Sequence, residues 1–320
     1  MTRFRRFASV LALSALALGA SVAGAQDKRL TIAFIPGIAS DPFFLAMEKG
    51  ARAAAEKMNI ELIWQGSASE YSPQTQLPFV DAALAQDIDA LILVPTDPDS
   101  LQPSVARAEA AGIPVITVDT TVTDQTYLTA HITGDNVDGG KQAAKTLAEQ
   151  IGGTGKVFIM SGSPSATTNT LREKGFRDEL AANFPNIEIV GREYANSQPA
   201  NATSAINTIL LNHPDLVGIF AIDGTSGTGA IAALRNNNAV GKIKLVGYDA
   251  YKAQVEALQE GVFTALVAQQ PAKEAELALE YAKAKVLGEG ADKIQKSVVI
   301  PNVIMTKENF GDTSSSMYSD

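Results

Sequence analysis

The stretch that decides the fold spans residues 90–119 and reads ALILVPTDPDSLQPSVARAEAAGIPVITVD. Its apolar runs, Ala90–Val94 and Pro114–Val118, have the length and composition of strands that are buried on both faces of a sheet. Between them, the Ala-rich segment Ser104–Ala111 predicts a helix. A strand, a helix and a second strand in this order predict a right-handed βαβ unit and therefore a parallel sheet.

The same alternation continues in both directions from this stretch. Further strands are predicted at Leu30–Ile35, Ile60–Trp64, Lys156–Met160, Ile187–Val190, Leu216–Ile222, Ile243–Tyr248 and Phe263–Val267. Further helices are predicted at Phe43–Met58, Pro78–Gln86, Lys141–Ile151, Thr170–Asn183, Ala202–Leu211, Thr228–Asn237 and Ala272–Leu287. Nine or more strands could form one large sheet, but 320 residues exceed what a single core usually occupies. We therefore predict an α/β protein built from two doubly wound parallel-sheet lobes.

The composition excludes several classes of protein and of site. With 46% hydrophobic residues, the chain is too apolar to be disordered. It contains no Cys, which excludes disulfides, thiolate zinc sites and a cysteine nucleophile. His131 and His213 are its two histidines, so we expect no metal site, and we expect no cofactor. A formal net charge of -9 argues against nucleic acid as a partner.

Residues 1–25 have the pattern of a secretory signal peptide. Arg3, Arg5 and Arg6 precede an apolar run over residues 7–20, and an A-x-A sequence ends at Ala25. A membrane anchor is the weaker interpretation, because the run is shorter than the roughly 20 residues that a spanning helix needs. Without Cys, the chain has no residue for lipid attachment at this point. We predict cleavage after Ala25 and a periplasmic protein that is not lipid-anchored.

Polar and aromatic residues that follow the predicted strands are the candidates for ligand contact. In open parallel sheets, ligands bind beyond the carboxyl ends of the strands, and two facing lobes would bring these residues to one rim. Carboxylates accept hydrogen bonds from adjacent hydroxyls, Arg and amides donate to oxygen atoms, and aromatic rings cover C–H faces. Such a set suits a hydroxyl-rich ligand. The candidates are Asp41, Phe43, Phe44, Asp119, Asn169, Arg172, Asp223, Asp249 and Gln269.

Several of these residues also have a purely structural interpretation. Asp41 can cap a helix that begins at Pro42, because Asp accepts from exposed N–H groups and Pro suits the first helical position. We expect one ring of the Phe43-Phe44 pair to pack in the core. Outside the set, we expect Trp64 to pack in the core as well, and the position of Tyr71 stays open.

The motifs that contain these residues resemble those of the periplasmic sugar-binding proteins of ABC importers, particularly the ribose-binding type. The resemblance extends from Lys28 to about Met305. It is carried in order by IAFIPGIASDPFF (32–44), ALILVPTDPDS (90–100), IPVITVD (113–119), HITGDNVDGGK (131–141), LREKGF (171–176), HPDLVGIFAID (213–223), VGYD (246–249) and ALVAQQP (265–271). It matches Phe43 and Phe44 to stacking aromatics, Asp119 and Asp249 to carboxylates that hold sugar hydroxyls, and Arg172 to a second-lobe arginine. Asp41, Asp223 and Gln269 match further polar contacts.

The resemblance implies the type I periplasmic binding protein fold, in which two lobes are joined by a three-stranded hinge. Crossings are expected near Gly134-Asp135, near Gln269-Gln270 and at Val299–Asn302. The N-terminal lobe would comprise residues 28–134 and 270–299, and the C-terminal lobe residues 135–269 and 300–320. The implied function is that of a monomeric solute-binding protein, not an enzyme. It would capture a monosaccharide or sugar alcohol between the lobes and deliver it to an ABC permease in the inner membrane.

The chain departs from the ribose-binding pattern at three places. Thr120 stands where ribose binders carry Arg, Val94 stands where they carry Asn, and their second-lobe aromatic is replaced near Asn196-Ser197. These changes argue against ribose itself and leave another monosaccharide or a sugar alcohol open. Two other functions stay open at this point: a periplasmic sensor that feeds a chemoreceptor or kinase, and a sugar-processing enzyme that uses Asp119 and Asp249 as acid and base.

Overall fold

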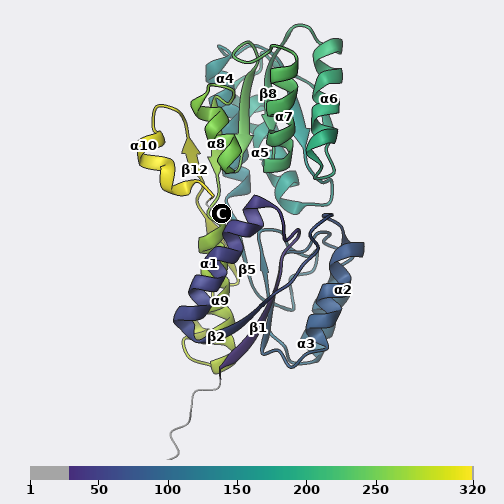
Figure 1. Cartoon of the computed structure of the whole chain (residues 1–320), viewed down its shortest axis with the longest axis vertical. Helices are drawn as coiled ribbons and strands as arrows, with labels where there is room; N and C mark the ends of the chain where they lie inside the picture. The colour runs from purple at the N-terminus through teal and green to yellow at the C-terminus, as the bar shows by residue number, and fades with distance from the viewer. Residues whose placement is uncertain (1–28, 319–320) are drawn as a thin grey trace, which may run out of the picture.

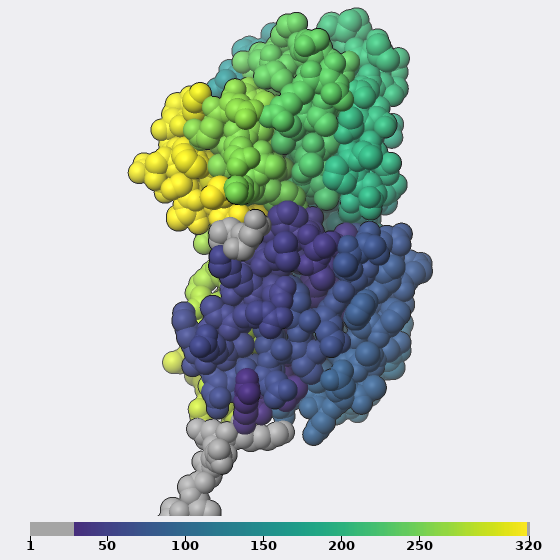
Figure 2. Space-filling view, in the orientation of Figure 1, coloured from purple at the N-terminus to yellow at the C-terminus, as the bar shows by residue number. Residues whose placement is uncertain are grey.

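The computed structural model describes residues 29–318 as two α/β lobes stacked end to end (Figure 1). The predicted signal segment, residues 1–25, lies outside the described residues. A narrow waist separates the two lobes in the space-filling view (Figure 2). Among the described residues, no helix is long and apolar enough to cross a membrane.

The first lobe contains a sheet of six strands in the order β11-β5-β4-β3-β1-β2, and every neighbouring pair is parallel. Its strands are β1 (Leu30–Ile35), β2 (Ile60–Trp64), β3 (Ala90–Leu93), β4 (Val115–Val118), β5 (Leu128–Gly134) and β11 (Ser297–Ile300). Its helices are α1 (Pro42–Met58), α2 (Pro73–Leu84), α3 (Gln102–Ala110) and α9 (Pro271–Leu287), with the short helix η1 (Ala291–Lys293).

The second lobe repeats this arrangement in the order β12-β10-β9-β8-β6-β7, in which only the β12–β10 pair is antiparallel. Its strands are β6 (Gly155–Ser161), β7 (Ile187–Tyr194), β8 (Leu216–Ala221), β9 (Lys244–Tyr248), β10 (Ala265–Ala268) and β12 (Val303–Met305). Its helices are α4 (Asn136–Gln150), α5 (Thr167–Asn183), α6 (Pro199–Asn212), α7 (Gly224–Asn236), α8 (Lys252–Gln259) and α10 (Phe310–Thr313), with the short helix η2 (Ser314–Ser316).

Each sheet is covered on both faces, as its apolar strands require. Along β1, Ile32 and Phe34 enter one buried cluster, whereas Ala33 and Ile35 enter another on the opposite face. Successive side chains of a strand point to opposite faces, so a strand that is apolar throughout needs helices on both sides. The parallel-sheet fold class that the sequence predicted is therefore confirmed.

The chain passes from one lobe to the other at the start of two helices. After β5 the chain enters α4, which packs against α5 and strand β9 of the second lobe. After β10 it enters α9, which packs against α1 and strand β4 of the first lobe. The third crossing lies between β11 and β12, at residues 301–302. Three segments therefore connect the lobes.

The structure corrects several predicted elements. Strands β5, β11 and β12 and helix α8 were not predicted, because polar residues such as His131 and Thr133 interrupt the apolar runs or because the elements are short. Helix α2 begins at Pro73, not at Pro78, because Ser72 caps it and Pro73 takes the first helical position. Helix α4 begins at Asn136 and not at Lys141, and its cap is Asp135.

Candidate functional site

All nine candidate residues line one pocket between the lobes, with an empty volume of about 510 Å³. The first lobe contributes Asp41, Phe43, Phe44 and Asp119, the second contributes Asn169, Arg172, Asp223 and Asp249, and Gln269 lies at a crossing. Clefts between domains are common binding sites for small molecules. The other lining residues, which were not among the nine candidates, are Ile38, Tyr71, Ser163, Ala166, Thr168, Ser197, Thr225 and Tyr251.

Asp119 and Asp249 occupy the same position in the two lobes. Asp119 follows β4 and Asp249 follows β9, which are equivalent strands of the two sheets, and each has a left-handed backbone, with φ of 59° and 73° respectively. The N–H of Asp119 donates to the carbonyl of Ile132, and that of Asp249 to the carbonyl of Val267, both at 2.8 Å. Asp is one of the few residues that adopt this conformation readily. The backbone turn therefore places a carboxylate at the same point of each rim.

Arg172 is held firmly on the second-lobe side of the pocket. Its Nε donates to Oδ1 of Asn136 at 2.7 Å, and its Nη1 donates to the carbonyl of Ile222 at 3.1 Å. Its guanidinium lies 3.8 Å from the centroid of the Tyr248 ring. Its Nη2 lies 4.0 Å from Oδ1 of Asp119, which belongs to the other lobe and lines the same pocket. Arg172 is 2% exposed, so its charge is buried in the site and not solvated on the surface of α5.

Asp223 both caps a helix and faces the pocket. Its Oδ1 accepts from the N–H of Ser226 at 2.8 Å, which caps α7, and its Oδ2 accepts from Nδ2 of Asn169 at 3.0 Å. Gly162 makes room for this pair, since a Cβ there would lie 1.6 Å from Oδ2 of Asp223. The capping and pocket-lining roles are therefore compatible.

Asp249 has hydrogen-bond donors on both of its carboxylate oxygens. Oδ2 accepts from the N–H of Gly224 at 2.8 Å. Oδ1 accepts from Nε2 of Gln269 at 2.6 Å and from the hydroxyl of Tyr318 at 3.0 Å. Burial raises the pKa of Asp249 above its usual value, and the charge of Arg172 together with the hydrogen bonds from Gln269 and Tyr318 opposes that shift. The orientation of the carboxylate is fixed by donors from three segments of the chain.

Asp119, unlike Asp249, has a carboxylate oxygen without a hydrogen-bond donor in the described part of the chain. It is 7% exposed, and within residues 29–318 its Oδ1 has no hydrogen-bond partner beyond the distant Arg172. Burial raises the pKa of Asp119, while the charge of Arg172 opposes the rise. An acceptor oxygen that is buried without a donor is unfavourable. This carboxylate can therefore accept a hydrogen bond from a ligand.

Asp41 accepts a hydrogen bond across the pocket from Tyr251, which was not among the predicted site residues. Its Oδ1 accepts from the N–H of Phe43 at 2.8 Å, which caps α1 as predicted. The Tyr251 hydroxyl, from the other lobe, lies 2.7 Å from Oδ1 and 2.9 Å from Oδ2. Burial raises the pKa of Asp41 to about 7, and the bond from Tyr251 opposes the rise. Tyr251 follows β9 closely, so the strand-end rule that identified Asp249 could also have found it.

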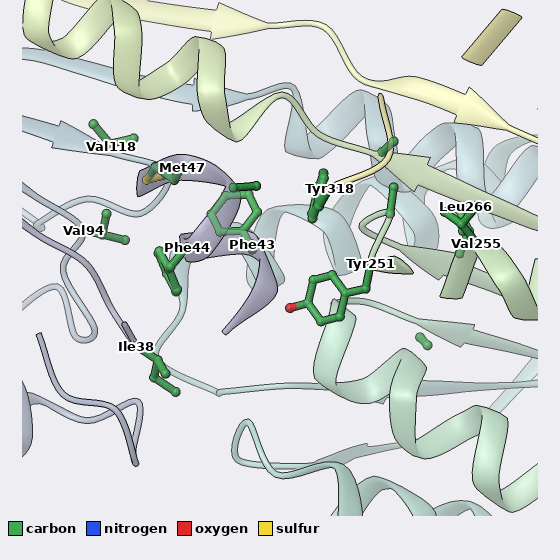
Figure 3. Close-up of a cluster of buried hydrophobic side chains, with 14 of the residues drawn as sticks. Ile38, Phe43, Phe44, Met47, Val94, Val118, Tyr251, Val255, Leu266 and Tyr318 are labelled. Atoms are coloured by element: carbon green, nitrogen blue, oxygen red, sulfur yellow. The ribbon is translucent and has the colours of Figure 1, made fainter. Parts of the chain in front are cut away.

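The aromatic residues divide between pocket and core. Phe43 and Phe44 meet edge to face, with centroids 5.2 Å apart, and both line the pocket while packing in the core (Figure 3). We expected one of the two rings to pack in the core, and both do so. Trp64 packs on Phe34, with centroids 4.6 Å apart, and does not line the pocket. Tyr71 does line it.

The positions where the chain departs from the ribose-binding pattern have structural roles here. The Thr120 hydroxyl donates to the carbonyl of Pro95 at 2.7 Å, away from the pocket. Val94 is fully buried in the first-lobe core. Ser197 lines the pocket with a small polar side chain where an aromatic was expected in that pattern. Among the described residues, no group of three or more His, Asp or Glu could hold a metal ion.

Residues 32–290 match the family described as "Periplasmic binding protein domain". The ribose import binding protein of Bacillus subtilis is 29% identical over 284 residues, which cover 88% of this chain and 89% of that protein. A xylitol-binding protein of Mycolicibacterium smegmatis is 30% identical over 300 residues, which cover 93% of this chain and 83% of that protein.

Among solved structures, the chain is similar to an ABC transporter solute-binding protein from Agrobacterium vitis bound with alpha-D-tagatopyranose. The two superpose with a TM-score of 0.87 and share 33% sequence identity, and the match covers 91% of this chain and 100% of that one.

Proposed function

The chain belongs to the family of periplasmic binding protein domains. On this basis, we propose that it is the solute-binding component of an ABC importer. Its relatives are transport proteins that bind sugars and sugar alcohols, not enzymes. We propose that this chain takes a monosaccharide or a sugar alcohol into the pocket between its lobes. The pocket acids then act as hydrogen-bond acceptors, not as an acid–base pair.

One observation carries the choice of ligand class. Asp119 offers an unpartnered buried oxygen, Arg172 offers an N–H group 4.0 Å away on the opposite wall, and two phenyl rings lie beside them. A ligand with adjacent hydroxyls can donate to Asp119 and accept from Arg172 at the same time. Its C–H face can lie against an aromatic ring. A flat aromatic or purely apolar ligand would leave the acid unpaired.

A ligand bound in this way stabilises the closed arrangement of the lobes. It contacts groups of both lobes only when they face each other, so it binds the closed form more tightly than any open form. Because the hydrogen bonds form in a buried pocket, we expect micromolar or tighter affinity, roughly -8 kcal/mol or better. In the full system, the closed protein delivers its ligand to a membrane permease.

Several finer points belong to the same proposal. We place the first lobe at residues 28–134 and 270–299 and the second at residues 135–269 and 300–320. The protein acts as a monomer in the periplasm, after cleavage of a signal peptide at Ala25, and has no lipid anchor. Size-exclusion chromatography with light scattering tests the monomer, and mass spectrometry of the exported protein tests the cleavage site.

The test of ligand class is a thermal-shift screen with D-ribose, D-tagatose, D-allose, D-arabinose, D-fucose, xylitol and myo-inositol. A ligand stabilises the folded state by RT ln(1 + [L]/Kd), which is about 2.7 kcal/mol at a concentration of 100 Kd. We expect at least one member to raise the melting temperature by several degrees and no member to be chemically altered. If no carbohydrate or polyol produces a shift, or if a product forms, the proposed function is wrong.

Substitutions in the pocket test whether a ligand that raises the melting temperature binds there. Asp119→Asn should reduce or abolish the shift, because it removes the unpartnered carboxylate at nearly constant volume. Asp292→Asn, at an exposed residue of η1, is the matched control and should leave the shift unchanged. An undiminished shift in Asp119→Asn would place the ligand elsewhere.

A further inference from the structure

A segment near the end of the chain contacts Asp249, a residue of the binding pocket, from outside both sheets. After β12, residues 310–318 form α10, η2 and a final turn beside the second lobe, and lead toward the waist between the lobes (Figure 1). Tyr318 is the last described residue and is 5% exposed. Its N–H donates to the carbonyl of Ala250 at 2.9 Å, which fixes the backbone beside Asp249.

The hydroxyl of Tyr318 lies between two groups of the site. It donates to Oδ1 of Asp249 at 3.0 Å and accepts from the backbone N–H of Gln269 at 3.2 Å. Tyr318 does not line the ligand pocket, so it contacts Asp249 from behind. Because hydrogen bonds to a charged carboxylate are stronger than neutral ones, this contact helps to determine where the oxygens of Asp249 point.

The ring of Tyr318 joins the two lobes. Its centroid lies 6.0 Å from that of Phe43 in the first lobe and 5.9 Å from that of Tyr251 in the second. The three side chains come from separate segments and lie together beside the start of α1 (Figure 3). Phe43 lines the pocket, and Tyr251 bonds to Asp41 there. One side chain therefore touches an aromatic wall of the pocket in one lobe and a carboxylate in the other.

We propose that Tyr318 is a positioning residue for ligand binding, and that residues 310–318 form a third part of the site beside the two lobes. The hydroxyl holds Asp249 in the orientation in which it accepts from the ligand, and the ring supports Phe43 and Tyr251 when the lobes are closed. This inference rests on the proposed function, since it assigns a role in carbohydrate or polyol binding.

Two variants and one control test the proposal. Tyr318→Phe removes only the hydroxyl, Tyr318→Ala removes the ring as well, and Tyr127→Phe removes the hydroxyl of a tyrosine that is 45% exposed. Titration calorimetry is carried out with D-ribose, D-tagatose, D-arabinose and xylitol. For each compound that binds the wild type, we expect Tyr318→Phe to weaken binding about tenfold, as loss of a hydrogen bond to a charged group predicts. Tyr318→Ala should weaken it further, and Tyr127→Phe should have no effect.

A second measurement needs no ligand and separates this proposal from the proposed function. The pKa of the Asp249 carboxyl is followed by carbon NMR in ligand-free protein, with Asp249→Asn used for assignment. The Tyr318 hydroxyl stabilises the ionised carboxylate, so Tyr318→Phe should raise the pKa of Asp249. Gln269, Arg172 and Asp223, which also act on Asp249, are unchanged in this variant. A merely structural tyrosine would not alter this titration.

The outcomes are distinguishable. Weaker binding together with a raised Asp249 pKa supports the positioning role. Unchanged binding with an unchanged pKa overturns it, as does a loss of binding that matches the fraction of unfolded protein measured by circular dichroism. If no compound binds the wild type, the proposed function fails, and the titration alone then decides whether Tyr318 positions Asp249.

Discussion

Strand for strand, the order β11-β5-β4-β3-β1-β2 of the first lobe corresponds to the order β12-β10-β9-β8-β6-β7 of the second. The edge strands differ, since β11 is parallel to its neighbour and β12 is antiparallel. The binding groups differ more. Asp249 in the second lobe has donors on both oxygens, whereas Oδ1 of Asp119, at the same position of the first lobe, has no hydrogen bond within residues 29–318.

This difference shows that the two lobes contribute to ligand binding in different ways. In the second lobe, Arg172, Asp223 and Asp249 are held by neighbouring groups before any ligand arrives. Such preorganisation lowers the entropy that binding must offset. In the first lobe, Asp119 is buried without a donor, so the ligand itself must supply one. The second lobe thus presents a prepared surface, whereas Oδ1 of Asp119 in the first lobe gains a donor only when the ligand supplies one.

The largest expected effect comes from removing the cation of the second lobe. Arg172→Ala removes the donor to Oδ1 of Asn136 and to the carbonyl of Ile222, and it leaves Asp119 facing the other pocket acids without a positive charge. Loss of one partner from a buried charged group typically changes binding by 2–5 kcal/mol or more, so we expect affinity to fall about 100-fold or further. Calorimetry measures the change, and Arg177→Ala, at an exposed residue of the same helix, is the control. Comparable losses in both variants would contradict the assignment.

The two equivalent aspartates give the most direct test of the comparison. We expect Asp249→Asn to weaken binding and also to destabilise the ligand-free protein by about 1.5–3 kcal/mol, because its carboxylate has several donors. Asp119→Asn should weaken binding but leave stability unchanged or raised, because its Oδ1 loses no hydrogen bond and Asn tolerates a left-handed backbone.

Urea unfolding of the ligand-free variants measures this difference. Equal destabilisation by the two substitutions would show that the lobes do not differ in preorganisation.

The pH dependence of stability should reflect the first-lobe acids. The pKa of Asp41 is raised from 3.8 to about 7 in the folded protein, so between these values the folded state binds more protons than the unfolded chain. Its contribution to stability therefore falls as the pH rises from about 4 to about 7. Asp41→Asn keeps the helix cap and should flatten this part of the profile. Unfolding measured across this range tests the prediction, and a profile identical to that of the wild type would contradict it.

A smaller effect is expected at the crossing between the lobes. Glu274, in the first turn of α9, is fully buried, and neither carboxylate oxygen has a hydrogen-bond partner among the described residues. Burial raises its pKa well above the usual value. Glu274→Gln should therefore change stability little at acidic pH, where both side chains are neutral, and its stability relative to the wild type should rise as the pH increases and ionisation of the buried acid becomes more favourable in the unfolded chain. Urea unfolding over a range of pH measures this difference, and a difference that falls with increasing pH would contradict the prediction.

Much of this architecture follows from local features of the chain. Runs such as Ala90–Val94 are too apolar to have a solvated face, so their sandwiching between helices was predictable. Asp119 and Asp249 follow such runs directly, and the carboxyl ends of parallel strands share one edge of a sheet. Strand β5 was missed because His131 and Thr133 interrupt its apolar pattern. Both side chains are buried and paired with β4 or the residue after it, since Nδ1 of His131 lies 3.0 Å from the hydroxyl of Thr117 and the hydroxyl of Thr133 donates to the carbonyl of Asp119.

The sequence by itself determined the alternation of strands and helices, the two-lobed class and the identity of nine side chains that meet in one pocket. These features follow from hydrophobic periodicity and from the rule that the carboxyl ends of parallel strands share one edge of a sheet, and both can be recognised in short stretches of sequence. Only the tertiary structure decided which of these side chains are already hydrogen-bonded. Tyr251 reaches Asp41 from 210 residues away, and Tyr318 reaches Asp249 from 69 residues away. Such contacts depend on how separate segments pack in space, and no local pattern of residues specifies them.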